Sequence, residues 1–174
     1  GDTITFAGFA SAVMHPEHIL RALEEAALAG EGPKGLTVVY ASGQGDSDSR
    51  GLNHLGVEGL CSKVIGGHWG LAPKLGKLCA ENKLAGYNLP QGTIAQLFRD
   101  IAAGRPGVLT HVGLGTFVDP RLEGGKLNQA AHEAGDVVKV VEFEGEEKLF
   151  YPAFPIQVAV IRASYADTKG NCTF

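Results

Sequence analysis

Short groups of glycine and polar residues follow several predicted β-strands, and their side chains and backbone N–H groups could contact a ligand. Open α/β sheets bind ligands at the carboxyl ends of their strands, so these groups are the first candidates for a site. Glycine lets a backbone approach a ligand closely, and neighbouring N–H groups can hold a carboxylate or another anion. The candidate ligand-contacting residues are Gly8, Phe9, Gly43, Gln44, Gly113, Gly115 and Thr116.

Each of these groups also has a purely structural interpretation. Phe9 suits the wall of a ligand pocket and the hydrophobic core equally well. The loop with Gly43 and Gln44 either contacts a substrate or partner, or is simply solvated. The turn at Gly113 either meets a ligand or only reverses the chain. Lys126 could pair with a phosphate or carboxylate, although an exposed lysine is the commoner outcome.

The histidines and cysteines do not predict a metal site or a disulfide framework. Cys61, Cys79 and Cys172 are an odd number without C-x-x-C spacing, and such cysteines are more often small buried hydrophobic residues than nucleophiles. The six histidines share no metal-ligand spacing, and His15 and His18 are predicted in the first turn of a helix. We therefore expect no bound metal and a reducing, cytoplasmic environment.

The composition predicts one globular domain. The 174 residues carry a net charge of −4, which argues against a nucleic-acid partner, and no apolar run approaches the roughly 20 residues of a membrane span. The sequence also lacks the features of a signal peptide at its start. Glycine is unusually frequent, with 25 residues, and its clusters between apolar runs suit tight turns beside a ligand.

The elements that position the candidates alternate between strand and helix. Strands are predicted over residues 3–6, 36–40, 63–65, 84–89 and 108–112. Helices are predicted from Pro16 to Gly30, over 71–81 and over 93–103. The first helix carries an apolar stripe of Ile19, Leu20, Leu23 and Ala27, and the third carries Ile94, Leu97, Phe98 and Ile101 on one face. This alternation predicts an α/β fold with a mostly parallel open sheet covered by helices.

The carboxyl-terminal part is predicted to be rich in β-structure. Residues 137–143 and 157–163 have strand character, and the acidic stretch 144–147 between them reads as an exposed turn. Prolines at 152 and 155 are expected to block regular strand pairing.

Three motifs in the same order resemble the family I CoA-transferases, especially the acetate/propionate CoA-transferase type. They are DTITFAGF at residues 2–9, LPQGT at 89–93, and GLGTFVDPR at 113–121 with GGKLN at 124–128. Together they resemble the amino-terminal, or α, half of such an enzyme. Ala7 replaces the first glycine of the usual Gly-Gly-Phe turn, a substitution similar to that of the propionate branch.

The resemblance implies covalent ping-pong chemistry in which a glutamate attacks an acyl-CoA thioester and carries CoA to a second short-chain carboxylate. Coenzyme A is then the carried group, and no metal is needed. That glutamate belongs to the carboxyl-terminal, or β, half; Glu58 and Glu123 precede glycines but lack its sequence context. By the same resemblance Gln91 lies beside the thioester and donates its amide to an oxyanion or a carboxylate. The alternative is a glutamine that only caps a helix.

We therefore expect residues 1–174 to be a truncated amino-terminal domain that binds acyl-CoA and a short-chain carboxylate. Its expected partners are the carboxyl-terminal half and further copies of itself. A second hypothesis is a non-catalytic acyl-CoA-binding or regulatory module of the same fold. An isomerase or sugar-phosphate binder is a third hypothesis, because the same general fold hosts such proteins and fold alone does not fix function. The complete motif around Gln91 argues against it. A nicotinamide-binding domain lacks its Gly-x-Gly-x-x-Gly motif.

Overall fold

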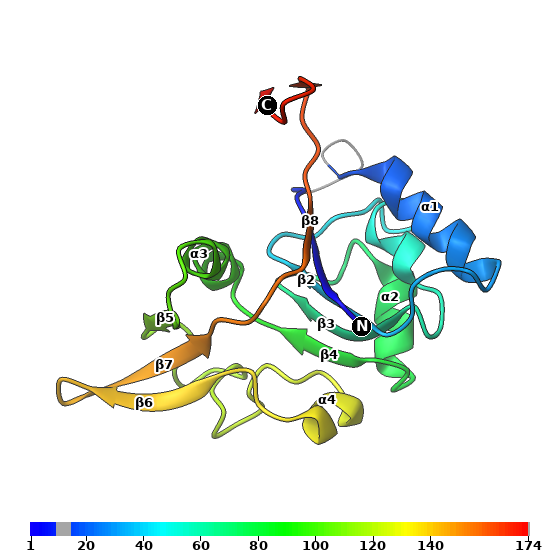
Figure 1. The fold of residues 1–174 in the computed structure, drawn as a ribbon. Coiled ribbons are helices and arrows are strands. Elements are labelled where there is room, and N and C mark those ends of the chain that lie inside the picture. The colour runs from blue at the N-terminus through cyan, green and yellow to red at the C-terminus, as the bar shows by residue number, and fades with distance from the viewer. Residues whose placement is uncertain (10–14, 174) are drawn as a thin grey trace.

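A parallel sheet with the strand order β4-β3-β2-β1-β8 forms the centre of the molecule (Figure 1). The computed structural model describes residues 1–9 and 15–173. The strands are β1 (Thr3–Phe6), β2 (Leu36–Tyr40), β3 (Cys61–Gly66), β4 (Ala85–Asn88) and β8 (Val158–Val160). Each adjacent pair is parallel, with Ile4 opposite both Val38 and Val158. The predicted α/β fold with a mostly parallel sheet is confirmed.

Two hydrophobic cores lie on opposite faces of this sheet because successive strand residues point to opposite sides. On one face, Val38 and Val64 pack with α1 (Glu17–Leu28), η1 (Leu52–Leu55) and α2 (Pro73–Ala80). On the other, Val39 and Ile65 pack with α3 (Gln91–Ala102), α4 (Gln129–Ala134) and the antiparallel strands. Strands buried on both faces explain the nearly continuous apolar runs of the sequence.

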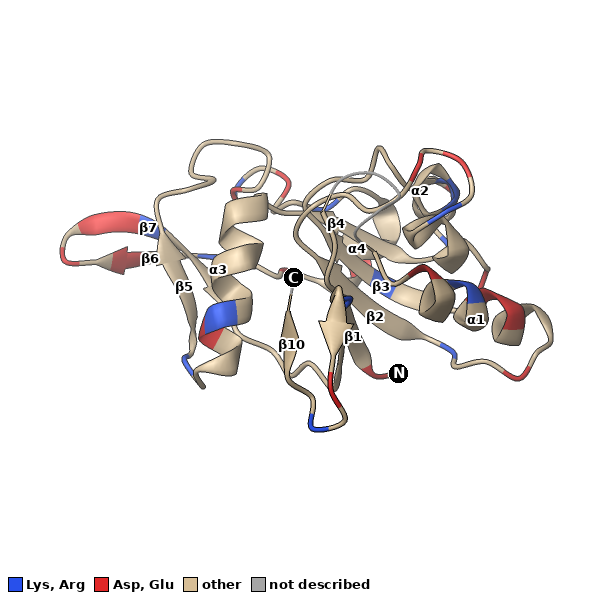
Figure 2. Cartoon of the chain, turned by 90° about the horizontal axis from the view of Figure 1, so that it is seen from above, with Lys and Arg blue, Asp and Glu red and all other residues tan. Residues whose placement is uncertain are grey.

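The antiparallel part has the strand order β5-β7-β6 and projects beside α3 (Figure 1). Its strands are β5 (Gly107–Thr110), β6 (Lys139–Phe143) and β7 (Glu146–Pro152). The strand predicted over 108–112 therefore forms as β5 but lies outside the parallel sheet, whose fifth strand is β8. Acidic side chains gather at the tip of the β6–β7 hairpin, at the predicted turn (Figure 2). A further short pair, β9 (Tyr165–Ala166) and β10 (Cys172–Thr173), follows β8.

The prediction that Pro152 blocks strand pairing is wrong. Pro152 is the last residue of β7 and lies opposite Gly107 of β5. The β6 partner ends earlier, at Lys139 opposite Phe150, so no neighbour requires the missing N–H of this proline. The partner of β6 is consequently β7 and not the stretch predicted over 157–163, part of which joins the parallel sheet as β8.

Two helix predictions also need correction. Gln91 begins α3 and Pro90 is its N-cap, so the helix starts two residues earlier than predicted. In α1, Leu20 is fully buried, but Ile19 is 48% exposed and does not belong to the buried stripe. None of the described helices is long and apolar enough to cross a membrane.

Candidate functional site

Four loops meet at the carboxyl edge of the parallel sheet, one after each of β1, β2, β3 and β4. Because these strands are neighbours in the sheet, the loops that follow them are neighbours too. The sequence candidates Gly8, Gly43, Gln44 and Gln91 lie in three of these loops, and the loop after β3 adds His68.

Gln44, from the loop after β2, packs on Gly8, from the loop after β1. Its side chain is almost fully buried, and its Nε2 donates to the carbonyl oxygen of Phe6 at 2.8 Å. A methyl group on Gly8 would lie 2.6 Å from both Cδ and Oε1 of Gln44. Glycine at position 8 therefore makes room for this glutamine, which holds the end of β1.

His68, from the loop after β3, packs in the same way on Gly43, from the loop after β2. A methyl group on Gly43 would collide with Nδ1 of the imidazole and lie 3.1 Å from its Cγ. On another side, a methyl group on Gly70 would lie 3.1 Å from Cε1. The ring thus lies against two positions that have no side chain.

Gln91, from the loop after β4, packs on Gly67, from the loop after β3. A methyl group on Gly67 would lie 2.6 Å from Cγ of Gln91 and would collide with the carbonyl oxygen of Ala41. Gln91 is exposed and makes no side-chain hydrogen bond to the start of α3, whose N-cap is Pro90. The structure therefore gives no support to a capping role for this glutamine.

These three contacts form a regular series, which we call the glycine ladder: Gly8–Gln44, Gly43–His68 and Gly67–Gln91. In each contact, a polar side chain of one loop rests on a glycine of the loop from the neighbouring strand. Since neighbouring strands are about 4.8 Å apart, the three side chains span on the order of 10 Å along the sheet edge. Gln91 and His68 are exposed and present an amide and an imidazole side by side, an arrangement suited to a carboxylate or a developing oxyanion. The Gln44 amide is buried and donates to Phe6.

Unpartnered polar atoms also concentrate at this edge. Of the four buried side-chain atoms without a hydrogen-bond partner in the described ranges, three are Tyr40 OH, Gln44 Oε1 and Asn88 Oδ1. Tyr40 ends β2 and Asn88 ends β4. Burial raises the pKa of Tyr40 far above its ordinary value, so its hydroxyl keeps its proton. Unsatisfied buried groups are rare in proteins, and their concentration favours this edge as the functional site.

The turn with Gly113, Gly115 and Thr116 has no contact with the ladder among the interactions of the described residues. Gly115 donates its N–H to Asp119 Oδ2 at 2.9 Å, and Thr116 Oγ1 donates to the carbonyl oxygen of Gly113 at 2.8 Å. Hydrogen bonds from Arg121 and from the Gly115 N–H hold the pKa of Asp119 well below its usual range. The Gly115 N–H is therefore engaged within its own turn, and ligand contact by this turn stays a prediction.

The structure does not agree with the interpretation of Phe9 as a core residue or of Lys126 as an exposed lysine. Phe9 is 67% exposed, so the interpretation as a core residue is wrong. Lys126 pairs with Asp136 and its side chain is only 9% exposed, so it is not the freely exposed lysine that the sequence favoured.

A second polar cluster, outside the ladder, joins α1 to η1. His54 Nε2 lies 3.0 Å from Glu17 Oε1, and His15 Nε2 lies 2.7 Å from Glu17 Oε2, which also accepts the Gly51 N–H at 2.9 Å. Burial alone would lower the pKa of His54, but hydrogen bonds to Glu17 and Glu24 outweigh burial and raise it. Burial alone would raise the pKa of Glu17, but the hydrogen bonds from His54, Gly51 and His15 outweigh burial and lower it.

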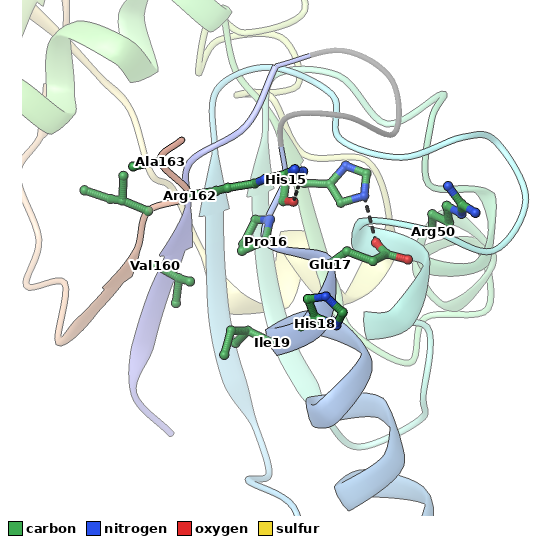
Figure 3. A pocket seen from close by; sticks show the side chains of 10 residues that line it. His15, Pro16, Glu17, His18, Ile19, Arg50, Val160, Arg162 and Ala163 are labelled. Carbon is green, nitrogen blue, oxygen red and sulfur yellow. Dashed lines mark hydrogen bonds and ion pairs between the residues drawn. The ribbon is translucent and has the colours of Figure 1, made fainter. Parts of the chain in front are cut away.

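This cluster borders a cavity of about 510 Å³ between the start of α1 and the segment after β8 (Figure 3). Ile19 and Val160 line its apolar side, and Arg162 extends towards His15, to whose carbonyl oxygen its Nη1 donates at 3.4 Å. No ladder residue lines this cavity. The cavity joins His18, Arg50 and Arg162 from three segments. We favour the ladder because it contains Gln91 of the LPQGT motif.

The sequence analysis missed His68 and the His54 cluster. Metal-ligand spacing was the only criterion applied to the histidines, and it does not detect a histidine that pairs with a carboxylate or packs on a glycine. For His68, the signal was available: Gly66 and Gly67 and then a polar residue follow the strand predicted over 63–65. For His54, no sequence pattern indicates the distant Glu17 and Glu24.

Comparison with known proteins shows similarity over the whole chain. The model of the Coenzyme A transferase family matches residues 1–174. Caffeate CoA-transferase of Acetobacterium woodii is 45% identical over 174 residues, which are all of this chain and 33% of that protein. Acetate CoA-transferase subunit alpha of Escherichia coli K12 is 30% identical over the full chain, which covers 68% of that subunit.

A solved structure is similar as well. The crystal structure of the acyl-CoA transferase YdiF of Escherichia coli O157:H7, in a thioester complex with CoA, matches with a TM-score of 0.94 and 37% identity. The match covers 99% of this chain and 33% of that one. The chain thus spans about a third of the length of the relatives most similar in sequence.

Proposed function

Since the chain belongs to the coenzyme A transferase family, we propose that it forms the substrate-facing wall of an enzyme that transfers CoA between short-chain carboxylates. The observation that supports this proposal is the glycine ladder, in which Gln91 of the LPQGT motif lies next to His68 at the carboxyl edge of the sheet. Residues 1–174 then act as the amino-terminal part of a longer enzyme. The resemblance seen in the sequence motifs is confirmed at the level of the family.

The proposed reaction is a covalent exchange in two halves. A glutamate carboxylate attacks the thioester carbonyl and the C–S bond breaks. CoA departs as its thiolate, and the glutamate and the acyl group are then joined as a mixed anhydride. The thiolate then attacks the glutamyl carbonyl, which releases the first carboxylate and leaves a glutamyl-CoA thioester. A second carboxylate reverses these steps and departs as its CoA thioester. In this scheme the Gln91 amide donates to the oxyanion that forms at the attacked carbonyl.

We propose that the nucleophilic glutamate lies outside this chain. Glu58 precedes β3 and therefore lies near the amino ends of the strands, away from the ladder, where it pairs with Lys83 at 3.0 Å. Glu123 is exposed and lies 3.4 Å from His132 of α4. Neither carboxylate contacts a ladder residue, which supports a nucleophile supplied by the remaining length that the relatives possess.

Apolar surface supports the proposed partner. Phe9, Phe117, Leu122 and Tyr165 are between 47% and 79% exposed. Burial of such side chains is favourable, so we propose that the remaining part of the enzyme, and further copies of it, cover them. A groove of about 320 Å³ between α3 and β5, lined by Pro90, Val108 and Val112, could hold a short acyl chain. We place the enzyme in the cytoplasm, where Cys61 and Cys79 would remain buried free thiols.

The test is acyl-CoA exchange, with propionyl-CoA and labelled acetate as substrates and labelled acetyl-CoA as the product measured. We expect no exchange by the 174-residue chain alone and exchange once the carboxyl-terminal part is added. Exchange by the chain alone would place the nucleophile within it, with Glu58 and Glu123 as candidates. Binding of acyl-CoA without exchange in the combined protein would instead support the non-catalytic module.

A further inference from the structure

His68 occupies the middle position of the glycine ladder, between two glutamines. Its ring rests on Gly43 as the Gln44 side chain rests on Gly8 and the Gln91 side chain rests on Gly67. Of the three side chains, His68 and Gln91 are exposed at the sheet edge, whereas Gln44 is buried. A role for Gln91 at the reacting carbonyl implies that the neighbouring ring faces the same bound substrate.

The imidazole nitrogens of His68 are not used within the protein. No described residue forms a hydrogen bond or ion pair with the ring, and its contacts are with Gly43 and Gly70. By contrast, the imidazoles of His15 and His54 are both held by carboxylates. His68 is exposed, whereas His15 and His54 are buried, so its ring faces outward at the sheet edge. The imidazole N–H is therefore available to a ligand that binds at this edge.

The surrounding charges decide which ligand suits this donor. The ladder contains no lysine or arginine, and the loop with Gly43 and Gln44 carries the carboxylates of Asp46 and Asp48. Asp46 accepts the N–H groups of residues 48, 49 and 50 at 2.8–3.0 Å, and these bonds lower its pKa to about 2. A diphosphate or a phosphate monoester would need several cationic groups. A single carboxylate needs only the imidazole and the neighbouring Gln91 amide, since the Gln44 amide is buried and donates to Phe6.

We propose that His68 binds the carboxylate group of the short-chain acid, the free substrate that accepts or has just lost CoA. This rests on the proposed function and adds a residue for which the sequence motifs gave no role. The acyl group of acyl-CoA is uncharged at the same position. His68 therefore contributes to binding of the free carboxylate more than to binding of the thioester.

The test uses the combined protein, in which the chain is assembled with the carboxyl-terminal part. Kinetics are measured separately for acetate and for propionyl-CoA in the wild type, His68→Ala and His68→Gln. For His68→Ala we expect the KM for acetate to rise about tenfold, with less than a twofold change in the KM for propionyl-CoA. His68→Gln keeps an N–H donor and should recover most of the loss. His18→Ala, which removes an exposed histidine of α1, is the matched control and should change neither KM.

Gly43→Ala offers an independent variant because its methyl group displaces the imidazole without removing it. It should raise the KM for acetate as His68→Ala does, and the double variant should be no worse than either single one. Equal effects of His68→Ala on both KM values, or no effect on acetate, would overturn the proposal. An inactive wild-type assembly would instead contradict the proposed function itself, so the two failures are distinguishable.

Discussion

His54 Nδ1 lies 2.5 Å from Glu24 Oε2, and the same ring contacts Glu17 through its other nitrogen. The histidine belongs to η1, whereas both glutamates belong to α1. A single imidazole therefore connects the first helix to the turn that precedes β3. This link stabilises the fold only while the ring is protonated and both carboxylates are ionised.

The first prediction concerns the pH dependence of stability. The pKa of His54 is raised above its ordinary 6.5, so its contribution is full below pH 6.5 and is lost as the pH rises through the folded-state value. The pKa of Glu17 is lowered below its ordinary 4.5, so its contribution is full above pH 4.5 and is lost as the pH falls through the folded-state value. The link is therefore strongest between these two ordinary values.

Replacement of His54 by glutamine should reduce the free energy of unfolding by about 2 kcal/mol at pH 5.5, where the charged hydrogen bonds are complete. The reduction should be smaller at pH 9. Urea unfolding of the wild type and His54→Gln at both pH values measures the difference. His132→Gln, which removes an exposed histidine, should show little change at either pH. An equal loss for His54→Gln at both pH values would contradict the protonated link.

The second prediction concerns catalysis by Gln91. Gln91→Ala should slow exchange by the combined protein by about 10²–10³-fold, the cost of one oxyanion donor. Stability should be nearly unchanged, because Gln91 is exposed at the start of α3. Gln129→Ala removes an exposed glutamine of α4, away from the ladder and the groove between α3 and β5, and should retain the wild-type rate. Comparable rates for the two variants would exclude Gln91 from the reaction.

The third prediction compares the stability of two alanine variants, one at Gly67 of the ladder and one at Gly92 of α3. Gly67→Ala should destabilise the chain by about 1–3 kcal/mol, because the methyl group meets the rigid backbone carbonyl of Ala41. Gly92→Ala lies in α3 with open space around its added methyl group and should be neutral or stabilising by up to about 1 kcal/mol. Denaturant midpoints of both variants provide the measurement. The idea fails if Gly67→Ala is as stable as Gly92→Ala.

The fourth prediction concerns the turn at Gly113. Asp119 is buried and accepts hydrogen bonds from the Gly115 N–H and from Arg121. Asp119→Ala should loosen this turn, because the Gly115 N–H and the guanidinium lose their acceptor. Amide hydrogen exchange over residues 113–121 should become faster while exchange in β2 and β3 stays slow. Unchanged protection of residues 113–121 would show that the carboxylate does not hold the turn.

The parallel sheet could be predicted from the sequence because its strands are short apolar runs separated by helices of clear 3.6-residue period. The pairing of the strand Gly107–Thr110 with β7 could not be predicted, because the residues of a strand do not determine which other strand it pairs with. β8 shows the same limit, since Val158–Val160 is too short for its place beside β1 to be read from its sequence.

The candidate site was predicted in part for a similar reason. The position of Gln44 and Gln91 after strands predicted that both lie at the carboxyl edge of the sheet, which is where the structure has them. Each polar side chain rests on a glycine of the loop after the neighbouring, earlier strand. This pairing depends on the order of the strands in the sheet, which a local sequence pattern does not give. His68 was missed because its significance comes from Gly43, a residue 25 positions earlier in the chain that only the fold brings beside it.

The pairing of β8 with β1 also affects how the chain is made. Ile4 lies opposite Val158, and Thr3 donates its N–H to the Gln157 side chain at 2.8 Å. One edge of β1 therefore has no partner in the described sheet until more than 150 further residues have been synthesised. At 5–20 residues per second, that takes on the order of ten seconds. The nascent sheet presents an open, aggregation-prone edge for this period, and a chaperone that covers an extended strand would act on β1 before β8 arrives.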